Sequence, residues 1–149
     1  MHTATSTITL TTDFGHKGPF VAVMKGIMLS RLPTARIIDL THEIHVHWSA
    51  EAGFWLARAY RYFPPGTVHV AVVDPGVGSS RRPLVVYGKG VYFLAPDNGL
   101  LSYIFRDSPD CQMFELTETA FHRSTSGTTF DARDIFASVA GWMSRGIPT

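Results

Sequence analysis

Asp74 is the residue of this sequence best placed to do chemistry, because it ends an apolar run and is followed by turn residues and arginines. The run Val68–Val73 (V-H-V-A-V-V) is mostly β-branched, as expected for a strand buried on both faces. The residues P-G-V-G after Asp74 stop the strand and permit a tight turn with positive φ. The carboxylate is thereby left at the carboxyl end of the strand, where α/β sheets bind ligands. Arg81 and Arg82 follow closely enough to fold back on it.

Spacing alone leaves two interpretations of Asp74 and Arg81 open. A carboxylate oriented by a guanidinium can bind a water or a sugar hydroxyl and keep its charge at pH 7. The same ion pair can also do no more than close a turn. Asp13 repeats the pattern, since it ends the β-branched segment Thr7–Thr12 and precedes F-G. Two acids at strand ends therefore define the region in which we expect ligand binding.

A cluster of histidines could be taken for a metal site. His42, His45 and His47 lie close together, with Asp39 and Glu43 beside them. Their spacing matches no zinc pattern with a third ligand at a defined distance, so we expect no metal. We interpret them as loop residues over a ligand or as solvated histidines, and a metal hydrolase that a chelator inactivates is the least favoured hypothesis.

Asp131 opens the last amphipathic segment, D-A-R-D. An acid in the first turn complements the helix dipole, so this residue could simply cap the helix. The sequence has neither a G-x-G-x-x-G nor a lysine-bearing P-loop, and no G-x-S-x-G elbow. Nucleoside triphosphate chemistry and a serine hydrolase are both unsupported.

Composition indicates a folded globular domain. The 149 residues are 45% hydrophobic and 17% charged, with 13 Lys+Arg against 12 Asp+Glu. This balance offers no electrostatic basis for nucleic acid or an anionic membrane as a partner. The single cysteine excludes an internal disulfide, and the N-terminus lacks the features of a signal peptide. We therefore expect a cytoplasmic protein that binds a small molecule.

The elements needed to position these residues alternate between strands and helices, which predicts an α/β layered fold with a mostly parallel central sheet flanked by helices. Gly88-Lys89-Gly90 between two apolar segments predicts one antiparallel hairpin. We expect one domain over residues 1–149. The predicted strands are 7–12, 36–40, 68–73, 84–87, 91–95 and 111–116, and the predicted helices are 18–32, 49–62 with Ser49 as N-cap, 100–105 and 131–146.

Six segments in order over nearly the whole chain resemble one family, the S-adenosylmethionine hydroxide adenosyltransferases, which are the hydrolase relatives of the fluorinating and chlorinating enzymes. The segments are T-T-D-F-G (11–15), V-A-V-M-K-G (21–26), I-I-D-L-T-H-E-I (37–44), F-P-P-G-T-V-H-V-A-V-V-D-P-G-V-G-S (63–79), A-P-D-N-G-L-L (95–101) and T-F-D-A-R-D-I-F-A (129–137).

The resemblance implies hydrolysis of S-adenosyl-L-methionine to adenosine and L-methionine by attack of water or hydroxide on C5′. S-adenosylmethionine is then the substrate, and no cofactor is expected. The sulfonium leaving group is already cationic, so the protein needs chiefly to desolvate, align and orient the nucleophile. The halogenases of the family use a tyrosine where this chain has Asp74, a difference that favours water over halide.

The resemblance also implies roles for particular residues. Asp74 and Arg81 match the aspartate and arginine of an Asp-Arg-His set that handles the water. Asp131 stands where the family motif T-F-H-G-R-D has histidine, and an ionised aspartate can accept a hydrogen bond from water but cannot donate one. Asp13 matches the residue that binds the ribose hydroxyls. The substrate-binding set implied by the matching segments is Asp13, Phe14, His47, Trp48, Thr129 and Phe130.

The family binds its substrate between this α/β N-terminal domain and a small β C-terminal domain of a neighbouring subunit in a trimer. From this resemblance we expect a homotrimer, and we expect that the C-terminal β domain is not encoded in these residues. Weak binding by the isolated chain follows from that expectation. The alternative hypothesis is a non-catalytic adenosine-binding, S-adenosylmethionine-binding or assembly domain that lacks turnover because of truncation and Asp131.

Overall fold

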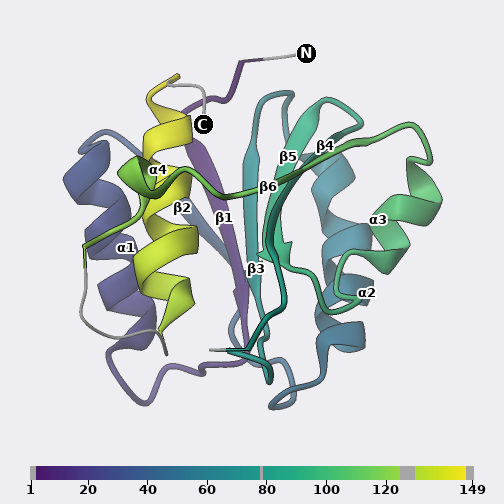
Figure 1. The fold of residues 1–149 in the computed structure, drawn as a ribbon, viewed down its shortest axis with the longest axis horizontal. Coiled ribbons are helices and arrows are strands. Elements are labelled where there is room, and N and C mark those ends of the chain that lie inside the picture. Colours follow the sequence, from purple (N-terminus) through teal and green to yellow (C-terminus); the bar gives the residue numbers. More distant parts are fainter. Residues whose placement is uncertain (1–2, 78, 125–129, 147–149) are drawn as a thin grey trace.

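The computed structural model describes residues 3–77, 79–124 and 130–146, which form one sheet with helices on both faces (Figure 1). The described strands are β1 (Thr7–Thr12), β2 (Arg36–Thr41), β3 (Val68–Val72), β4 (Pro83–Gly88), β5 (Val91–Pro96) and β6 (Gln112–Glu115). The helices are α1 (Phe20–Arg31), α2 (Ser49–Ala59), α3 (Ser102–Asp107), the π-helix η3 (Ala132–Ala137) and α4 (Ser138–Ser144), with short 3-10 helices η1 (Tyr60–Tyr62) and η2 (Thr119–Phe121).

The strand order is β2-β1-β3-β5-β4-β6. β1 pairs in parallel with β2 and β3, and β3 pairs in parallel with β5. Among the strands described, β4 alone points in the opposite direction, and it pairs antiparallel with both β5 and β6. Its turn to β5 has positive φ at Lys89 (52°) and Gly90 (82°), which matches the right-handed twist of a hairpin. The predicted α/β class, mostly parallel with one antiparallel hairpin, is confirmed.

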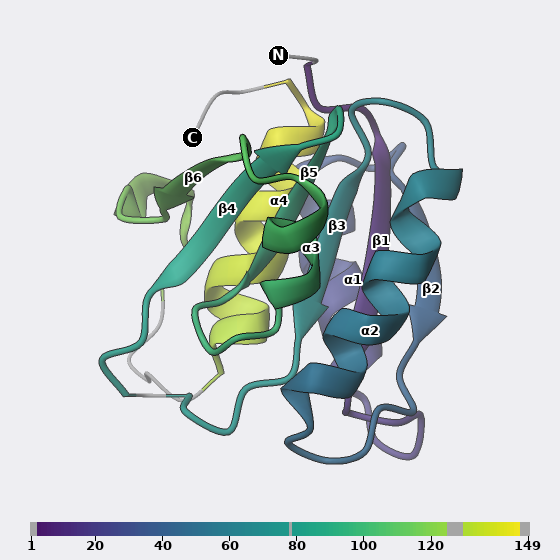
Figure 2. The same ribbon diagram turned by 90° about the vertical axis from the view of Figure 1, so that its right-hand side faces the viewer.

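The sheet separates two hydrophobic cores. Figure 2 shows α2 and α3 in front of the sheet, with α1 and α4 behind it. Because side chains alternate along a strand, Val70 of β3 packs in the core under α1 and α4, while its neighbour Ala71 packs under α2 and α3. Every residue of β1 and β3 is buried, as expected for central parallel strands covered on both faces.

A close backbone approach fixes α2 against the segment that leads into α3. A Cβ built on Gly53 would lie 2.2 Å from the carbonyl oxygen of Leu100, so only glycine fits there. This contact brings the turn after β5 beside the N-terminal part of α2. Asn98, in the same turn, is thereby placed close to the start of α2.

Two local predictions are wrong. Ser49 does not cap α2, because its hydroxyl donates a hydrogen bond to the carbonyl oxygen of Val73. The last helix begins with a π-helical segment in place of an α-helical turn, and Asp131 makes no side-chain cap. In the turn after Asp74, Gly76 has no positive φ, and its lack of a Cβ leaves room for Arg81, whose Cδ would lie 3.3 Å from that atom. The other glycine of this turn, Gly78, lies outside the described residues.

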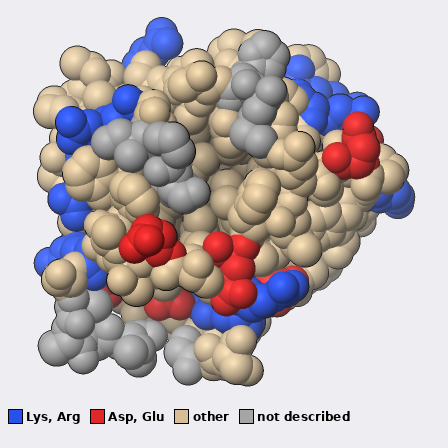
Figure 3. Space-filling model, turned by 45° about the horizontal axis from the view of Figure 1, so that its top comes forward, with Lys and Arg blue, Asp and Glu red and all other residues tan. Residues whose placement is uncertain are grey.

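The parallel strands end at the lower side of the molecule in Figure 1. Seen obliquely from above and in front, acidic and basic side chains lie mostly toward the margins of the visible face, with uncharged residues between them (Figure 3). Within the described residues, no helix has the length and apolar character needed to span a bilayer. β1 and β3 end side by side at the lower edge of the sheet, so Asp13 and Asp74, which follow these strands, both lie at this edge.

Candidate active site

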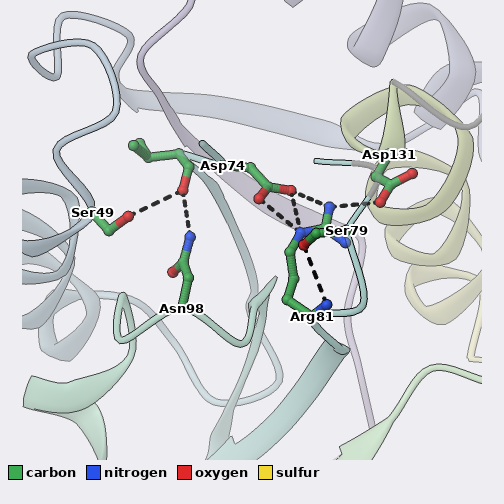
Figure 4. Close-up of polar contacts among 7 residues, drawn as sticks. Ser49, Asp74, Ser79, Arg81, Asn98 and Asp131 are labelled. Carbon is green, nitrogen blue, oxygen red and sulfur yellow. Dashed lines mark hydrogen bonds and ion pairs between the residues drawn. The ribbon is translucent and has the colours of Figure 1, made fainter. Parts of the chain in front are cut away.

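Asp74 and Arg81 form a bidentate ion pair just beyond β3 (Figure 4). Nε of Arg81 donates to both carboxylate oxygens, at 2.8 Å to Oδ1 and 2.9 Å to Oδ2, and Nη2 donates to Oδ2 as well. The prediction that Arg81 folds back on Asp74 is confirmed as geometry. Arg82 turns elsewhere and binds Asp97 at 2.8 Å. Both oxygens of Asp74 are thus oriented by one guanidinium.

The same guanidinium reaches a second carboxylate. Nη2 of Arg81 donates to Oδ2 of Asp131 at 2.6 Å, across 50 residues of sequence. The three side chains are largely withdrawn from solvent, with 10% of Arg81, 6% of Asp74 and 13% of Asp131 exposed. Hydrogen bonds to Asp74 raise the pKa of Arg81; burial opposes this rise and the bond to Asp131 adds to it. Arg81 therefore stays cationic between two carboxylates.

Within the part of the chain that the structure describes, one carboxylate oxygen of Asp131 has no hydrogen-bond partner. Its bonds to the described residues involve Oδ2, and in Figure 4 the other oxygen points away from Arg81. The residue lies at the start of the π-helical segment η3, a kind of helix irregularity that is frequent at functional sites. Asp131 can therefore accept a hydrogen bond or a proton from a molecule bound beside the ion pair.

Two side chains hold the strand end that carries Asp74. The carbonyl oxygen of Val73 accepts a hydrogen bond from Nδ2 of Asn98 at 2.8 Å and another from Oγ of Ser49 at 3.3 Å (Figure 4). Oδ1 of Asn98 also accepts from the backbone N–H of Leu100, which closes its own turn. Neither side chain was among the predicted site residues. The segment P-D-N-G marked Asn98 as a turn residue, but nothing in the sequence indicated its partner.

Asp13 directly follows β1, which is the strand next to β3. Its Oδ2 accepts a hydrogen bond from the backbone N–H of His47 at 2.9 Å. His47 adopts φ of 64°, a left-handed conformation that is uncommon outside glycine and that places its N–H toward Asp13. The structure thus brings His47 to Asp13 through its backbone. The neighbouring Trp48 is 54% exposed.

Aromatic rings line up beside this edge. Phe14 and Phe130 lie 6.1 Å apart in an edge-to-face arrangement, and Phe20 contacts both, at 5.9 Å and 5.4 Å between ring centroids. Phe20 is half exposed and was not among the predicted site residues. Thr129, a predicted substrate-binding residue, lies outside the described residues. The aromatic cluster offers an apolar wall next to the strand ends.

The histidines do not gather around one point. His42 is buried and contacts Thr12 and Asp39, whereas His45 is exposed and pairs with Glu51 at 2.7 Å. Over residues 3–77, 79–124 and 130–146 no group of three His, Cys, Asp or Glu side chains could hold a metal ion. The histidines therefore serve as separate hydrogen-bonding groups within this part of the chain.

These features define a class: an α/β domain whose site is built from carboxylates at the carboxyl ends of adjacent parallel strands. Comparison with known proteins gives the family. The model of the SAM hydroxide adenosyltransferase N-terminal domain matches residues 8–149, and the chain belongs to this family.

Two curated relatives carry the same name, (R)-S-adenosyl-L-methionine hydrolase. The protein from Methanocaldococcus jannaschii is 41% identical over 137 residues, covering 89% of this chain and 51% of the relative. The protein from Thermus thermophilus is 36% identical over 143 residues, covering 91% of this chain and 56% of the relative. The chain therefore spans about half the length of the curated relatives it matches.

A solved structure supports the fold. The crystal structure of an uncharacterized conserved protein from Thermotoga maritima superposes with a TM-score of 0.91 at 38% sequence identity. The match covers 95% of this chain and 55% of that one.

Proposed function

We propose that this chain forms the nucleophile-binding half of an enzyme that hydrolyses S-adenosyl-L-methionine to adenosine and L-methionine. The observation that carries the proposal is the cluster of Asp74 and Asp131 around the Arg81 guanidinium, at the strand ends of a domain whose relatives are named as hydrolases of this substrate. Those names specify the (R) form, and we propose the same preference for this protein.

The reaction is a displacement at C5′ of the adenosyl group. The water oxygen forms a bond to C5′ while the C5′–S bond breaks. The electron pair of the C5′–S bond stays on sulfur, which converts the sulfonium to the thioether of methionine. The proton released from water passes to a carboxylate and then to solvent. Because the leaving group is already cationic, the step needs neither a cofactor nor a metal, and orientation of the water supplies most of the assistance.

Each residue of the cluster has a distinct part in this proposal. Arg81 holds the Asp74 carboxylate in one orientation, so that Asp74 can fix the attacking water. Asp131, through the oxygen that Arg81 does not engage, accepts the proton. This assignment replaces the family's histidine by a carboxylate acceptor.

The remaining predicted residues bind substrate. Asp13 accepts hydrogen bonds from the ribose hydroxyls through Oδ1, since the N–H of His47 already occupies Oδ2. Trp48 offers an exposed aromatic face to the ligand, and the rings of Phe14 and Phe130 exclude water from the edge. Thr129 belongs to the same set by its place in the motif.

We propose further that the site is completed outside the matched region. The family model describes an N-terminal domain, and the curated relatives are about twice as long as the matched segment. A C-terminal domain, supplied by a neighbouring subunit of a homotrimer, would then cover the adenine. Size measurement by light scattering, with and without such a domain, tests this part of the proposal.

The activity is tested by incubating the protein with (R)- and (S)-S-adenosyl-L-methionine in ¹⁸O-water, alone and together with the C-terminal half of a relative. We expect methionine and adenosine that carries ¹⁸O on its 5′ oxygen. Asp74→Asn should lower turnover at least about 100-fold, the usual contribution of a group that handles a reacting proton or water. The control Asp97→Asn changes an exposed carboxylate paired with Arg82 and should leave turnover intact.

Absence of both products with the completed site would overturn the proposal. Binding of adenosine without turnover under those conditions would instead establish the non-catalytic binding module. Formation of ¹⁸O-labelled homoserine with 5′-methylthioadenosine, the products of attack on the methionine chain, would refute attack at C5′.

A further inference from the structure

His42 is a buried histidine with a partner on each ring nitrogen. Its side chain is fully withdrawn from solvent, immediately after β2. Nδ1 lies 2.7 Å from Oγ1 of Thr12, and Nε2 lies 2.8 Å from Oδ1 of Asp39. Oδ2 of Asp39 accepts from Nζ of Lys25 at 2.7 Å. Four side chains from α1, β2, β1 and the loop after β2 thus form one hydrogen-bonded chain.

The direction of this chain follows from its members. A carboxylate only accepts, so Nε2 of His42 carries the hydrogen that points at Asp39. In the tautomer that carries its hydrogen on Nε2, Nδ1 accepts from the hydroxyl of Thr12. That leaves the Thr12 oxygen to accept from the backbone N–H of Phe14, 3.2 Å away.

The ionised state of Asp39 supports this direction. Burial raises the pKa of Asp39, but hydrogen bonds from Lys25 and His42 outweigh burial and leave the pKa below its ordinary value. At neutral pH the carboxylate is therefore charged and holds the imidazole hydrogen on Nε2. The tautomer of His42 is fixed from the far side of the ring.

His42 also contacts, through its backbone, the turn after β1 that contains Asp13. Its carbonyl oxygen accepts a hydrogen bond from the N–H of Gly15 at 2.8 Å. The turn that contains Asp13 is therefore tied to His42 on both sides, through Thr12 before it and Gly15 after it. The Asp13 carboxylate itself is oriented by the N–H of His47, five residues further along the same loop.

We infer that His42 is a positioning residue, which orients the Asp13 carboxylate for two neighbouring hydroxyls of a ribose by fixing the turn at the end of β1. The choice of ribose as ligand rests on the proposed function. The effect on the turn does not depend on any ligand, and the two parts are tested separately.

The same strand contains a matched control. Oγ1 of Thr9 forms a comparable hydrogen bond with Nδ1 of His69, at 2.6 Å, and both residues are fully buried. This pair lies in the interior of β1, away from the turn. Thr12→Val and Thr9→Val each remove the hydroxyl from a buried threonine–histidine pair and leave a histidine nitrogen without its partner. Thr12→Val also removes the acceptor of the Phe14 N–H, so His42→Leu, which keeps that acceptor, shows the share of the effect that comes from His42.

The ligand-independent test is hydrogen exchange measured by NMR at the amides of Gly15 and His47. Their acceptors are unchanged in both variants, so faster exchange reports movement of the turn and not loss of an acceptor. We expect Thr12→Val to speed their exchange about tenfold, the effect of losing one buried hydrogen bond, and Thr9→Val to leave it unchanged. His42→Asn, whose amide still reaches toward Thr12, should restore slower exchange relative to His42→Leu.

The ligand test compares adenosine with 2′,3′-dideoxyadenosine by calorimetry. Thr12→Val should reduce the affinity ratio between the two about tenfold, while Thr9→Val keeps the ratio of the unaltered protein. Equal effects of the two variants on both measurements would reduce His42 to a structural residue and overturn the inference. An unaltered protein that fails to distinguish the two nucleosides would refute the ribose role of Asp13, with the exchange result still deciding whether His42 positions the turn.

Discussion

Replacing Arg81 by methionine isolates the contribution of the shared guanidinium. Arg81→Met keeps an unbranched apolar stem and removes all hydrogen bonds from the side chain to Asp74 and Asp131. Those carboxylates are 6% and 13% exposed, so neither can regain full hydration without movement of the chain. The variant therefore leaves two like charges facing each other at the edge of the sheet.

The expected loss of stability follows from this burial. Removing one partner of a buried ion pair costs about 3–5 kcal/mol, because the remaining charge stays desolvated. We expect about 3 kcal/mol, the lower end of that range, since water can approach the edge of the sheet. Arg82→Met is the matched control: Arg82 and Asp97 are 49% and 38% exposed, and such surface pairs contribute about 0–1 kcal/mol.

The measurement is the free energy of unfolding in urea at pH 7, followed by circular dichroism. A third protein, Arg81→Met combined with Asp131→Asn, should recover part of the loss because only one charge remains and the new amide can donate to Asp74. If Arg81→Met costs no more than Arg82→Met, or if the added Asp131→Asn brings no recovery, the three groups do not act as a buried charged cluster and the reasoning fails.

Three further predictions concern the supports of the site and the core. Asn98→Ala should lower the free energy of unfolding by about 1 kcal/mol and reduce turnover, because the Val73 carbonyl loses its shorter side-chain hydrogen bond; unchanged turnover would contradict a positioning role. Burial lowers the pKa of His69 to about 3, so below about pH 6.5 the unfolded chain binds a proton that the folded protein does not. As the pH is lowered from about 6.5 to 3, the free energy of unfolding should therefore fall by about 1.4 kcal/mol per pH unit. In urea titrations, His69→Gln should lack this slope. Gly53→Ala should destabilise the protein strongly, whereas Gly26→Ala, at an exposed helical position with open space around it, should raise the melting temperature through a gain of up to about 1 kcal/mol; the same sign for both would contradict the close approach at α2.

Much of the fold could be predicted because its signals are local. The β-branched runs of β1 and β3 fit only a strand buried on both faces, and Gly88-Lys89-Gly90 supplies the positive φ that the hairpin turn uses. The π-helical start of the last helix has no comparable signal. Its hydrophobic spacing resembles that of an α-helix, and the difference lies in backbone hydrogen bonds that tertiary packing selects.

Spacing in the sequence predicted site contacts only where the partners are near each other, and the place of Asp131 beside Arg81 came from the family resemblance. Asp74 and Arg81 are seven residues apart, and the turn between them is short enough for the contact to be expected. Ser49 was assigned to the start of α2, because a serine at a helix boundary normally caps it. Its hydroxyl is instead used by Val73, 24 residues away, a partner that helix signals do not encode.

The sequence by itself determined the chemistry of the strand ends. Two acids, Asp13 and Asp74, each follow a mostly β-branched segment that stops at a turn. Only the tertiary structure decided how they are held. It shows that Arg81, which the family resemblance favoured over Arg82, engages both Asp74 and Asp131, and it sets His42 behind the Asp13 turn. The physical reason is that strand formation follows from neighbouring residues, whereas the partners of a buried charge come from whichever segments the packed sheet brings to the same edge.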